Sequence, residues 1–386
     1  MTGAASARHL PPLARFPEEW EAALAELGEP RYRGKQLFRW IHRRGVFDPQ
    51  AMSDLPEALR GKLGDLGIAA PVEVLSVHRS SDGTRKLVLG LAGGARVECV
   101  LIPMTRLEDA DAAAVVDDED EAATELADAP ARRVTLCIST QYGCAMGCRF
   151  CASGRAGLRR GLEAHEIVAQ VLVARAHLEP GEELKNLVFM GMGEPLHHYD
   201  RTARALRLLL HPDGQNMSPR RITVSTVGLV PGIQKLGQDF QGKVGLAISL
   251  HAPNDAIRSR LLPMNDRYPI AALMKALREY PLPRRRRITI EYTLIAGVND
   301  GPEHARELAR LLSRLPVKIN LIPMNRVHGT DFEAPPSAAV ARFQDTLAGL
   351  GFSCFVRTRR GDEVDAACGQ LAMAHDLVKL GTPRPE

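Results

Sequence analysis

The chain has no long hydrophobic run. None of its 386 residues belongs to an apolar stretch near the roughly 20 residues that a membrane-spanning helix needs. The first residues, MTGAASARHLPPLARF, also lack the apolar centre of a secretory signal, so we expect a cytoplasmic protein without a membrane partner. Hydrophobic residues make up 45% and charged residues 25% of the chain, which are the usual values for a folded protein and exclude a largely disordered one.

One segment lacks positive charge. Residues 107–130 hold ten Asp and Glu and no Lys or Arg, with little apolar surface, so we expect a disordered acidic loop over 107–131. The net charge of +4 thus leaves +14 on the remainder. Its positive side chains form five clusters: Arg31, Arg33, Lys35, Arg39, Arg43 and Arg44; Arg155, Arg159 and Arg160; Arg220 and Arg221; 284–287; Arg357, Arg359 and Arg360. Together they favour a nucleic acid partner, although any single cluster could be a solvated face.

Seven cysteines, an odd number, suit a reducing compartment, and three of them stand close together without a fourth ligand nearby. Cys144, Cys148 and Cys151 occur in QYGCAMGCRFCASG at C-x3-C-x2-C spacing. A structural zinc normally needs four closed Cys or His ligands. Three thiolates can instead hold a [4Fe–4S] cluster and leave one iron open to a small molecule. The interleaved glycines indicate a loop around a bound group, with zinc and inert packing as the alternatives.

The hydrophobic period predicts a helical start to the chain and an α/β remainder. Residues 16–70 predict three helices, the third beginning at Ser53 or Asp54, and residues 72–104 predict three β runs. From Arg132, strands alternate with helices, which favours a parallel sheet in a partial (β/α)6 barrel, open on one side. The expected strands are 132–140, 185–192, 221–226, 243–250, 287–295 and 317–322.

These patterns predict five parts. They are a helical RNA-binding domain (1–71), a β-rich extension (72–106), the acidic loop (107–131), the partial barrel (132–345) and a C-terminal segment (346–386).

The strings CAMGCRFC, GMGEP, STVG, SLHAPND and MNRVHG each follow a predicted strand, where barrel enzymes build their active sites. In GMGEP, Gly193 permits close backbone approach and Glu194 can accept the amino group of an amino-acid-like ligand, for which we propose S-adenosylmethionine. Ser225 could instead cap a helix, and His251 could be a core imidazole.

The ordered strings CIST-QYGCAMGCRFC, VFMGMGEPL, AISLHAPND, NLIPMN and GDEVDAACGQL resemble the radical S-adenosylmethionine methyltransferases of the RlmN and Cfr family, and most of all its RlmN branch, over about residues 16–380. The resemblance implies one [4Fe–4S] cluster on Cys144, Cys148 and Cys151. It also implies an S-adenosylmethionine site built from Gly193, Glu194, Ser225, Ser249, Leu250, His251 and Asn325.

The resemblance further implies methylation of adenine C2 in 23S ribosomal RNA, at the peptidyl transferase region, and in transfer RNA next to the anticodon. Two S-adenosylmethionine molecules are used per turnover: one methylates Cys368, and the other yields a radical that activates this methyl group. Cys137 then resolves an RNA adduct, leaving a disulfide bond. Glu98 would be the proton acceptor, although a strand glutamate more often faces solvent. A cytosolic donor such as flavodoxin would supply electrons, and Cys99 and Cys354 would be packing thiols.

Two other readings stay open at the level of sequence. A Cfr-like enzyme would use the same cysteines to methylate C8 of adenine. A non-catalytic RNA-binding protein with a structural metal would make Cys137 and Cys368 dispensable.

Overall fold

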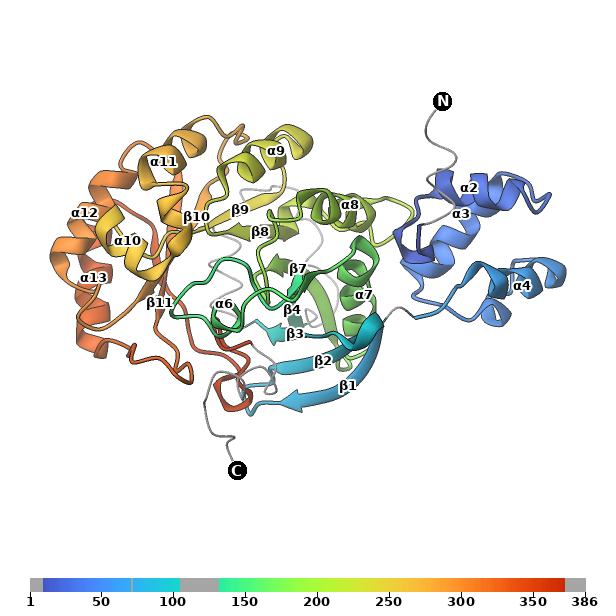
Figure 1. Ribbon diagram of the computed structural model, residues 1–386, viewed down its shortest axis with the longest axis horizontal. Coiled ribbons are helices and arrows are strands. Elements are labelled where there is room, and N and C mark those ends of the chain that lie inside the picture. Colours follow the sequence, from blue (N-terminus) through green and yellow to red (C-terminus); the bar gives the residue numbers. More distant parts are fainter. Residues whose placement is uncertain (1–9, 71, 105–131, 372–386) are drawn as a thin grey trace.

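The computed structural model describes residues 10–70, 72–104 and 132–371 (Figure 1). The expected acidic loop and the end of the expected C-terminal segment therefore lie outside the described residues. Within the described ranges, no helix has the length and apolar character needed to cross a membrane.

One ten-stranded sheet organises the molecule, in the order β1-β2-β3-β4-β7-β8-β9-β10-β11-β12. Its antiparallel part contains β1 (Val72–Arg79), β2 (Arg85–Leu91) and β3 (Arg96–Pro103). The parallel part contains β4 (Arg132–Cys137), β7 (Glu182–Phe189), β8 (Ile222–Thr226), β9 (Gly245–Ser249), β10 (Ile288–Leu294), β11 (Val317–Pro323) and β12 (Cys354–Val356). Because β1 and β12 are the two edges of this sheet, the barrel is open, and the predicted α/β class is confirmed.

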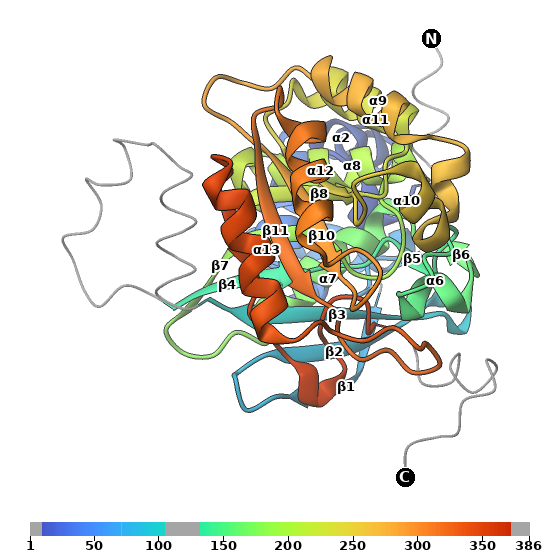
Figure 2. The same cartoon turned by 90° about the vertical axis from the view of Figure 1, so that its left-hand side faces the viewer.

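Helices cover the outer face of the parallel strands (Figure 2). They are α7 (Ala164–Arg175), α8 (Tyr199–Leu210), α9 (Val230–Phe240), α10 (Asp255–Leu261), α11 (Ile270–Arg278), α12 (Pro302–Leu312) and α13 (Ser337–Gly349), while the short α6 (Ala152–Ala156) belongs to the cysteine loop. The burial pattern shows the layering: β10 (ITIEYTL) is buried on both faces, although polar residues alternate with apolar ones along it, whereas α12 buries one stripe formed by Ala305, Leu308, Ala309 and Leu312. A separate short pair, β5 (Gln141–Tyr142) with β6 (Arg160–Gly161), flanks the cysteine loop.

The N-terminal helices lie to one side of the barrel (Figure 1). They are α2 (Pro17–Ala25), α3 (Tyr32–Phe38), which continues as a π-helical turn (Arg39–Arg43), and α4 (Glu57–Leu63). Lys35 and Arg39 form ion pairs of 3.0 and 2.6 Å with Asp213, in the loop after α8. Part of the first basic cluster therefore holds the helices against the barrel.

The predicted start of the third helix is wrong. Helix α4 begins at Glu57, after Pro56, and not at Ser53 or Asp54. The Asp54 carboxylate instead accepts a hydrogen bond from the indole N–H of Trp40, so it is used to tie α4 to the preceding helical segment.

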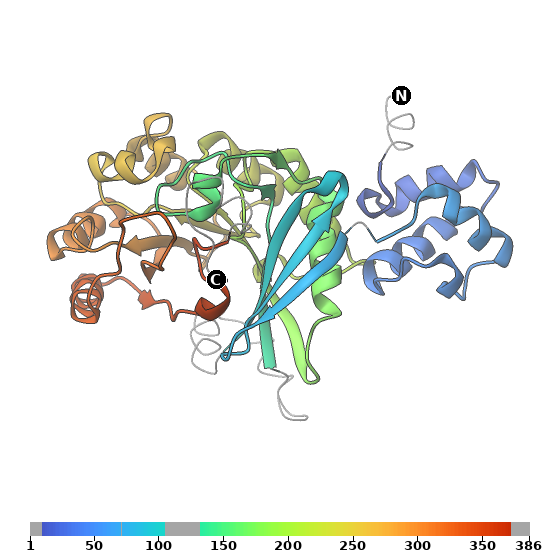
Figure 3. The same ribbon diagram turned by 60° about the horizontal axis from the view of Figure 1, so that its bottom comes forward.

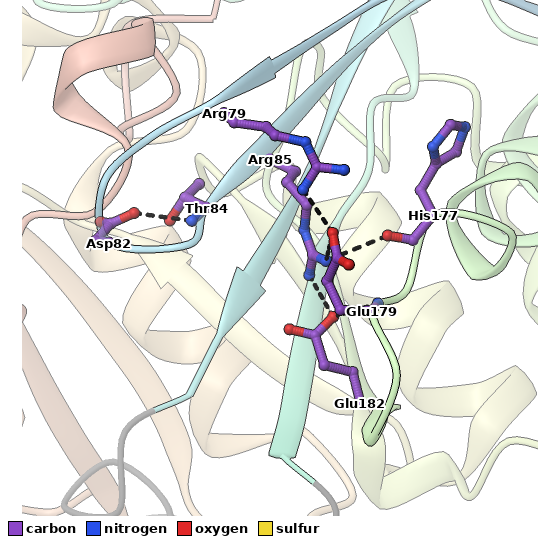
Figure 4. A network of polar contacts seen from close by, with 7 residues as sticks. All are labelled: Arg79, Asp82, Thr84, Arg85, His177, Glu179 and Glu182. Atoms are coloured by element: carbon purple, nitrogen blue, oxygen red, sulfur yellow. Dashed lines mark hydrogen bonds and ion pairs between the residues drawn. The ribbon is translucent and has the colours of Figure 1, made fainter.

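The β-rich extension continues the barrel sheet, because β3 pairs with β4 with Val100 opposite Cys137. Figure 3 shows the long β1–β2 hairpin crossing beside α7. Arg85 anchors this hairpin to the turn before β7: its buried guanidinium lies 2.6 Å from the Glu182 carboxylate (Figure 4). Glu179 in the same turn pairs with exposed Arg79 at 2.6 Å. One buried and one exposed ion pair thus join the same two segments.

We predict very different costs for breaking these two ion pairs. Arg85→Ala would leave Glu182 as a buried, uncompensated charge and should lower the free energy of unfolding by about 3 kcal/mol or more. Arg79→Ala removes a solvent-screened pair and should cost less than about 1 kcal/mol. Urea unfolding of the two variants measures both values. Equal costs would show that the Arg85 pair does not anchor the hairpin.

Candidate active site

Three thiols lie in the loop between β5 and α6, beyond the carboxyl end of β4. Cys144 and Cys148 are buried and Cys151 is half-buried. The backbone of Gly143 has a φ of +76°, and a Cβ there would lie 1.8 Å from the carbonyl oxygen of Gly157, so this turn requires glycine. All three cysteines line one cavity. The loop therefore presents three sulfur atoms to a common space.

The arrangement and the pKa values of the three thiols indicate what kind of group they could hold. Among residues 10–70, 72–104 and 132–371, no group of three or more His, Cys, Asp or Glu side chains is arranged to hold a single metal ion. Burial raises the pKa of Cys144 to about 12 and raises those of Cys148 and Cys151, and in Cys148 the neighbouring thiols add to the effect. Three thiolates in this cavity therefore need a positively charged metal centre beside them.

The GMGEP segment forms one wall of the same cavity. Gly193 has a φ of +106°, and a Cβ there would lie 2.6 Å from Cβ of Gln141. The amide oxygen of Gln141 accepts a hydrogen bond of 3.1 Å from the N–H of Glu194. The Glu194 carboxylate accepts from the N–H groups of Leu196 (3.0 Å) and Val227 (2.9 Å), while burial raises its pKa to about 7. A fixed, buried carboxylate of this kind suits the ammonium group of a bound amino acid.

Strands β8 and β9 contribute the predicted polar groups at their carboxyl ends. Ser225 and Ser249 line the cavity with their hydroxyl oxygens 3.5 Å apart, and Ser225 lies inside β8 and not at a helix start. Nδ1 of His251 accepts a hydrogen bond of 2.9 Å from the N–H of Thr293, so the proton of the neutral ring is on Nε2. Burial lowers the His251 pKa to about 3. Leu250 is fully buried and does not line the cavity, and its backbone N–H and carbonyl oxygen bond to Glu291 and Arg258.

Cys368 reaches the cavity on the segment 361–371, which we call the Cys368 loop. The side-chain amide of Asn325 donates 2.9 Å to the carbonyl oxygen of Cys368, and both residues line the cavity. The N–H of Ala152, in α6, donates 2.8 Å to the carbonyl of Gly369, and the Ser153 hydroxyl donates to that of Leu371. The end of β11 and the first turn of α6 therefore both fix the backbone around Cys368.

A second, adjoining cavity contains both proposed redox thiols. Cys137, Cys151 and Cys368 line it together. Burial raises the pKa of Cys137 to about 12, the nearby Cys368 adds to this, and Arg357 opposes it. Cys99 and Cys354 line neither cavity. The structure thus separates the two expected packing thiols from the five others.

Glu98 is not a solvent-facing strand residue, so that alternative is wrong. Its side chain is buried, and Oε1 lies 3.3 Å from the ammonium of Lys86. Lys86 also lies 3.4 Å from the carbonyl oxygen of Asp365 in the Cys368 loop. Glu98 itself lines neither of the two cavities, and its link to the site passes through Lys86.

Sequence reasoning missed three charged residues at the site. Glu291, in the middle of β10, lines the main cavity, accepts 3.0 Å from the amide of Asn320, and has a pKa raised by burial. Arg357, which follows β12, lines both cavities. Arg258 is fully buried and donates to the carbonyls of Val227 and Leu250, which ties β8 to β9. The sequence offered one signal for Glu291, which is the only carboxylate in the predicted strand RITIEYTLI.

The tip of the β1–β2 hairpin holds the start of the Cys368 loop. The N–H and hydroxyl of Ser81 donate to the two carboxylate oxygens of Glu363 at 2.8 and 2.7 Å. The carboxylate of Asp82 accepts 2.9 Å from the N–H of Gly361. The bonds from Ser81 lower the pKa of Glu363. The β-rich extension thus has a role at the site, through the loop that carries Cys368.

The partial barrel and the three-thiol loop together define a radical S-adenosylmethionine enzyme. Residues 138–312 match the Radical SAM superfamily, and residues 17–68 match the ribosomal RNA large subunit methyltransferase N-terminal domain. The chain is 59% identical to the dual-specificity RNA methyltransferase RlmN of Sorangium cellulosum, over 94% of this chain and 96% of that protein. It is 45% identical to the RlmN of Anaeromyxobacter dehalogenans, over 94% and 92%.

A solved structure agrees with these relatives. The crystal structure of a radical SAM methyltransferase from Sphaerobacter thermophilus has a TM-score of 0.82 and 42% identity, and the alignment covers 93% of this chain and 98% of that one. The chain belongs to the RlmN family and is an S-adenosylmethionine-dependent RNA methyltransferase with a [4Fe–4S] cluster. The residues present fit this cluster, because the three thiols of the loop, two of them buried and one half-buried, line one cavity.

We predict that the hairpin tip controls the mobility of the Cys368 loop. In a Ser81→Ala/Glu363→Ala variant, amide hydrogen exchange over 361–371 should speed up, since the three hydrogen bonds that Ser80 and Ser81 donate to Glu363 are lost. Strands β8 to β10 should exchange as before. Glu73→Ala, which removes an exposed carboxylate from the same hairpin, is the control and should leave the loop unchanged. Unaltered exchange in the double variant would mean that the tethers do not hold the loop.

Proposed function

We propose that the protein methylates C2 of adenosine in 23S ribosomal RNA, at the peptidyl transferase region, and in transfer RNA, next to the anticodon. The observation that carries the proposal is the adjoining pair of cavities, which share Cys151 and Cys368 and contain the three-thiol loop on one side and Cys137 on the other. The relatives are named dual-specificity RNA methyltransferases, and residues 17–68 match a ribosomal RNA large subunit methyltransferase domain, which supports an RNA substrate.

Cys144, Cys148 and Cys151 hold the cluster in this proposal. Bound there, the cluster and two S-adenosylmethionine molecules per turnover supply a methyl group and one-electron chemistry. Glu194 receives the ammonium group of the bound molecule at the backbone turn formed by Gly193. The rest of the bound S-adenosylmethionine lies among Ser225, Ser249, Leu250, the His251 ring and Asn325. This radical route suits adenine C2, a carbon without a lone pair for a methyl cation donor to use.

Cys368 carries the methyl group and Cys137 releases the product. Once the carbon on Cys368 is bonded to the RNA, the Cys137 thiolate attacks the Cys368 sulfur. The S–S bond forms, the Cys368 sulfur–carbon bond breaks, and its electron pair remains on the carbon, which takes up a proton to become the new methyl group. The buried Cys137 is a neutral thiol at rest, because its pKa is about 12, so the attack requires that its proton be removed first. A dithiol reductant then reopens the disulfide bond.

Glu98 takes the proton lost from adenine C2 in this scheme. Its position beside Lys86, which also contacts the Cys368 loop, supports the role, because the ammonium group stabilises an ionised carboxylate next to that loop. We further propose a cytoplasmic location and a flavodoxin-like electron donor, both of which suit an enzyme with reduced thiols and a reducible cluster.

The ring position and the substrate are tested in one experiment. Anaerobically reconstituted enzyme is incubated with ribosomal and transfer RNA transcripts, which are then digested to nucleosides and analysed by mass spectrometry against standards. We expect 2-methyladenosine from both RNAs. Finding only 8-methyladenosine would replace the proposal with a Cfr-like activity, and no methylated adenosine would refute it.

A Cys137→Ala variant should trap the covalent intermediate. Without the resolving thiol, the RNA remains attached to Cys368 and migrates as a slow band on a denaturing gel. Cys354→Ala removes a thiol that lines neither cavity and should form product without such a band. Release of free methylated RNA by Cys137→Ala at the normal rate would contradict the assigned role.

A further inference from the structure

A further cavity, distinct from the two at the active site, lies at the opposite end of the barrel. It has a volume of about 440 Å³, within the size range of sites that hold more than a single ion. Its lining comes from the beginnings of β8, β9, β10 and β11, whereas the active site uses the other ends of the same strands. In β10, Thr289 lines this cavity, and the nearest residue of the strand that lines the active site is Glu291, about 7 Å further along at about 3.3 Å per residue.

This cavity, which we call the basic cavity, is positively charged. Seven of its 14 lining residues are Arg or Lys, namely Arg220, Lys243, Lys318 and the arginine run 284–287, and none of the 14 is Asp or Glu. Two clusters that are more than 60 residues apart in the sequence, around Arg220 and over 284–287, are thus brought to one place. A convergence of this kind cannot be an ordinary solvated helix face, because it joins the loops that precede β8, β9 and β10 with Lys318 at the start of β11.

The basic cavity contains an unfavourable backbone conformation and unfavourable charge contacts. Arg285 has a φ of +66°, a left-handed conformation that is unfavourable for a residue with a side chain. It lies in a tight turn in which the N–H of Arg286 donates 3.0 Å to the carbonyl of Pro283. Burial lowers the pKa of Arg286, and the charge of Arg220 lowers it further. Backbone strain and mutual repulsion at the same place are typical of a site that is completed by a ligand of opposite charge.

We propose that the basic cavity binds backbone phosphates of the RNA substrate, at nucleotides away from the methylated adenosine. Arginine offers a planar fork of donors that matches phosphate oxygens, and four arginines in succession can serve more than one phosphate. The exposed side chains of Arg220, Arg284 and Arg287 suit an extended backbone better than an enclosed small anion. The proposal rests on RNA being the substrate and is independent of which adenine carbon is methylated.

The variant that tests the proposal is Arg284→Gln/Arg286→Gln. Lys275→Gln/Arg342→Gln is the matched control, because it removes two positive charges from the exposed faces of α11 and α13, outside the cavity. The anaerobic holoenzymes are compared on a full-length transfer RNA transcript and on a short hairpin that contains only the target loop. Binding is measured by fluorescence anisotropy between about 50 and about 200 mM salt, and KM and kcat are measured for both RNAs.

For the cavity variant we expect weaker binding of the full transcript, a several-fold higher KM with unchanged kcat, and a salt slope reduced by roughly 0.7 to 0.9 per lost phosphate contact. Binding of the short hairpin should not change. The control should behave like the unmodified enzyme on both RNAs.

Three results would overturn the proposal. An equal loss of transcript affinity in the cavity variant and the control would mean that only the net charge of the protein affects binding. Equal losses on the transcript and the hairpin would mean that the cavity supports the fold. Unchanged transcript binding, together with thermal stabilisation by inorganic pyrophosphate that the cavity variant loses, would assign the cavity to a small phosphate ligand. Nucleoside analysis of the same reactions shows separately whether C2 is methylated, so failure of that function is distinguishable.

Discussion

Negative charge on buried sulfur is the constraint on which the rest of the structure depends. Burial raises the pKa values of Cys144 and Cys148, so these thiols need a positive metal centre to act as thiolates. Glycine turns in the cysteine loop bring the three sulfur atoms to one space. Helix α6 and Asn325 next to this loop form hydrogen bonds with the backbone around Cys368.

The parallel sheet makes this possible because it collects distant segments at one edge. Thiols from positions 137 to 368 meet beyond the carboxyl ends of the strands, although over 200 residues separate the first from the last. The antiparallel hairpin has a supporting part, since its tip holds the Cys368 loop and its base is anchored by the buried pair of Arg85 and Glu182. The amino ends of the same strands carry a different chemistry, the arginine-rich cavity.

Most of the site residues expected from the sequence line one cavity of the structure, because the motifs that carry them are local in the chain. The thiol loop, GMGEP and SLHAPND are contiguous strings, and apolar runs separated by helices are enough to predict six parallel strands. The failures depended on tertiary contacts. Asp54 bonds to Trp40 and does not cap the third helix. Glu291 reaches the site from a strand whose local pattern shows only burial, and Arg357, which the sequence placed in a basic cluster, lines both cavities.

The central claim is that three cysteines hold a cluster with one iron open to S-adenosylmethionine. Electron paramagnetic resonance of the anaerobically reconstituted, reduced protein tests it most directly, with spectra recorded before and after S-adenosylmethionine is added. The account predicts a [4Fe–4S] signal whose g values change when S-adenosylmethionine binds to that iron. A signal that is identical in the two spectra would contradict it, because the cluster would then have no position for the ligand.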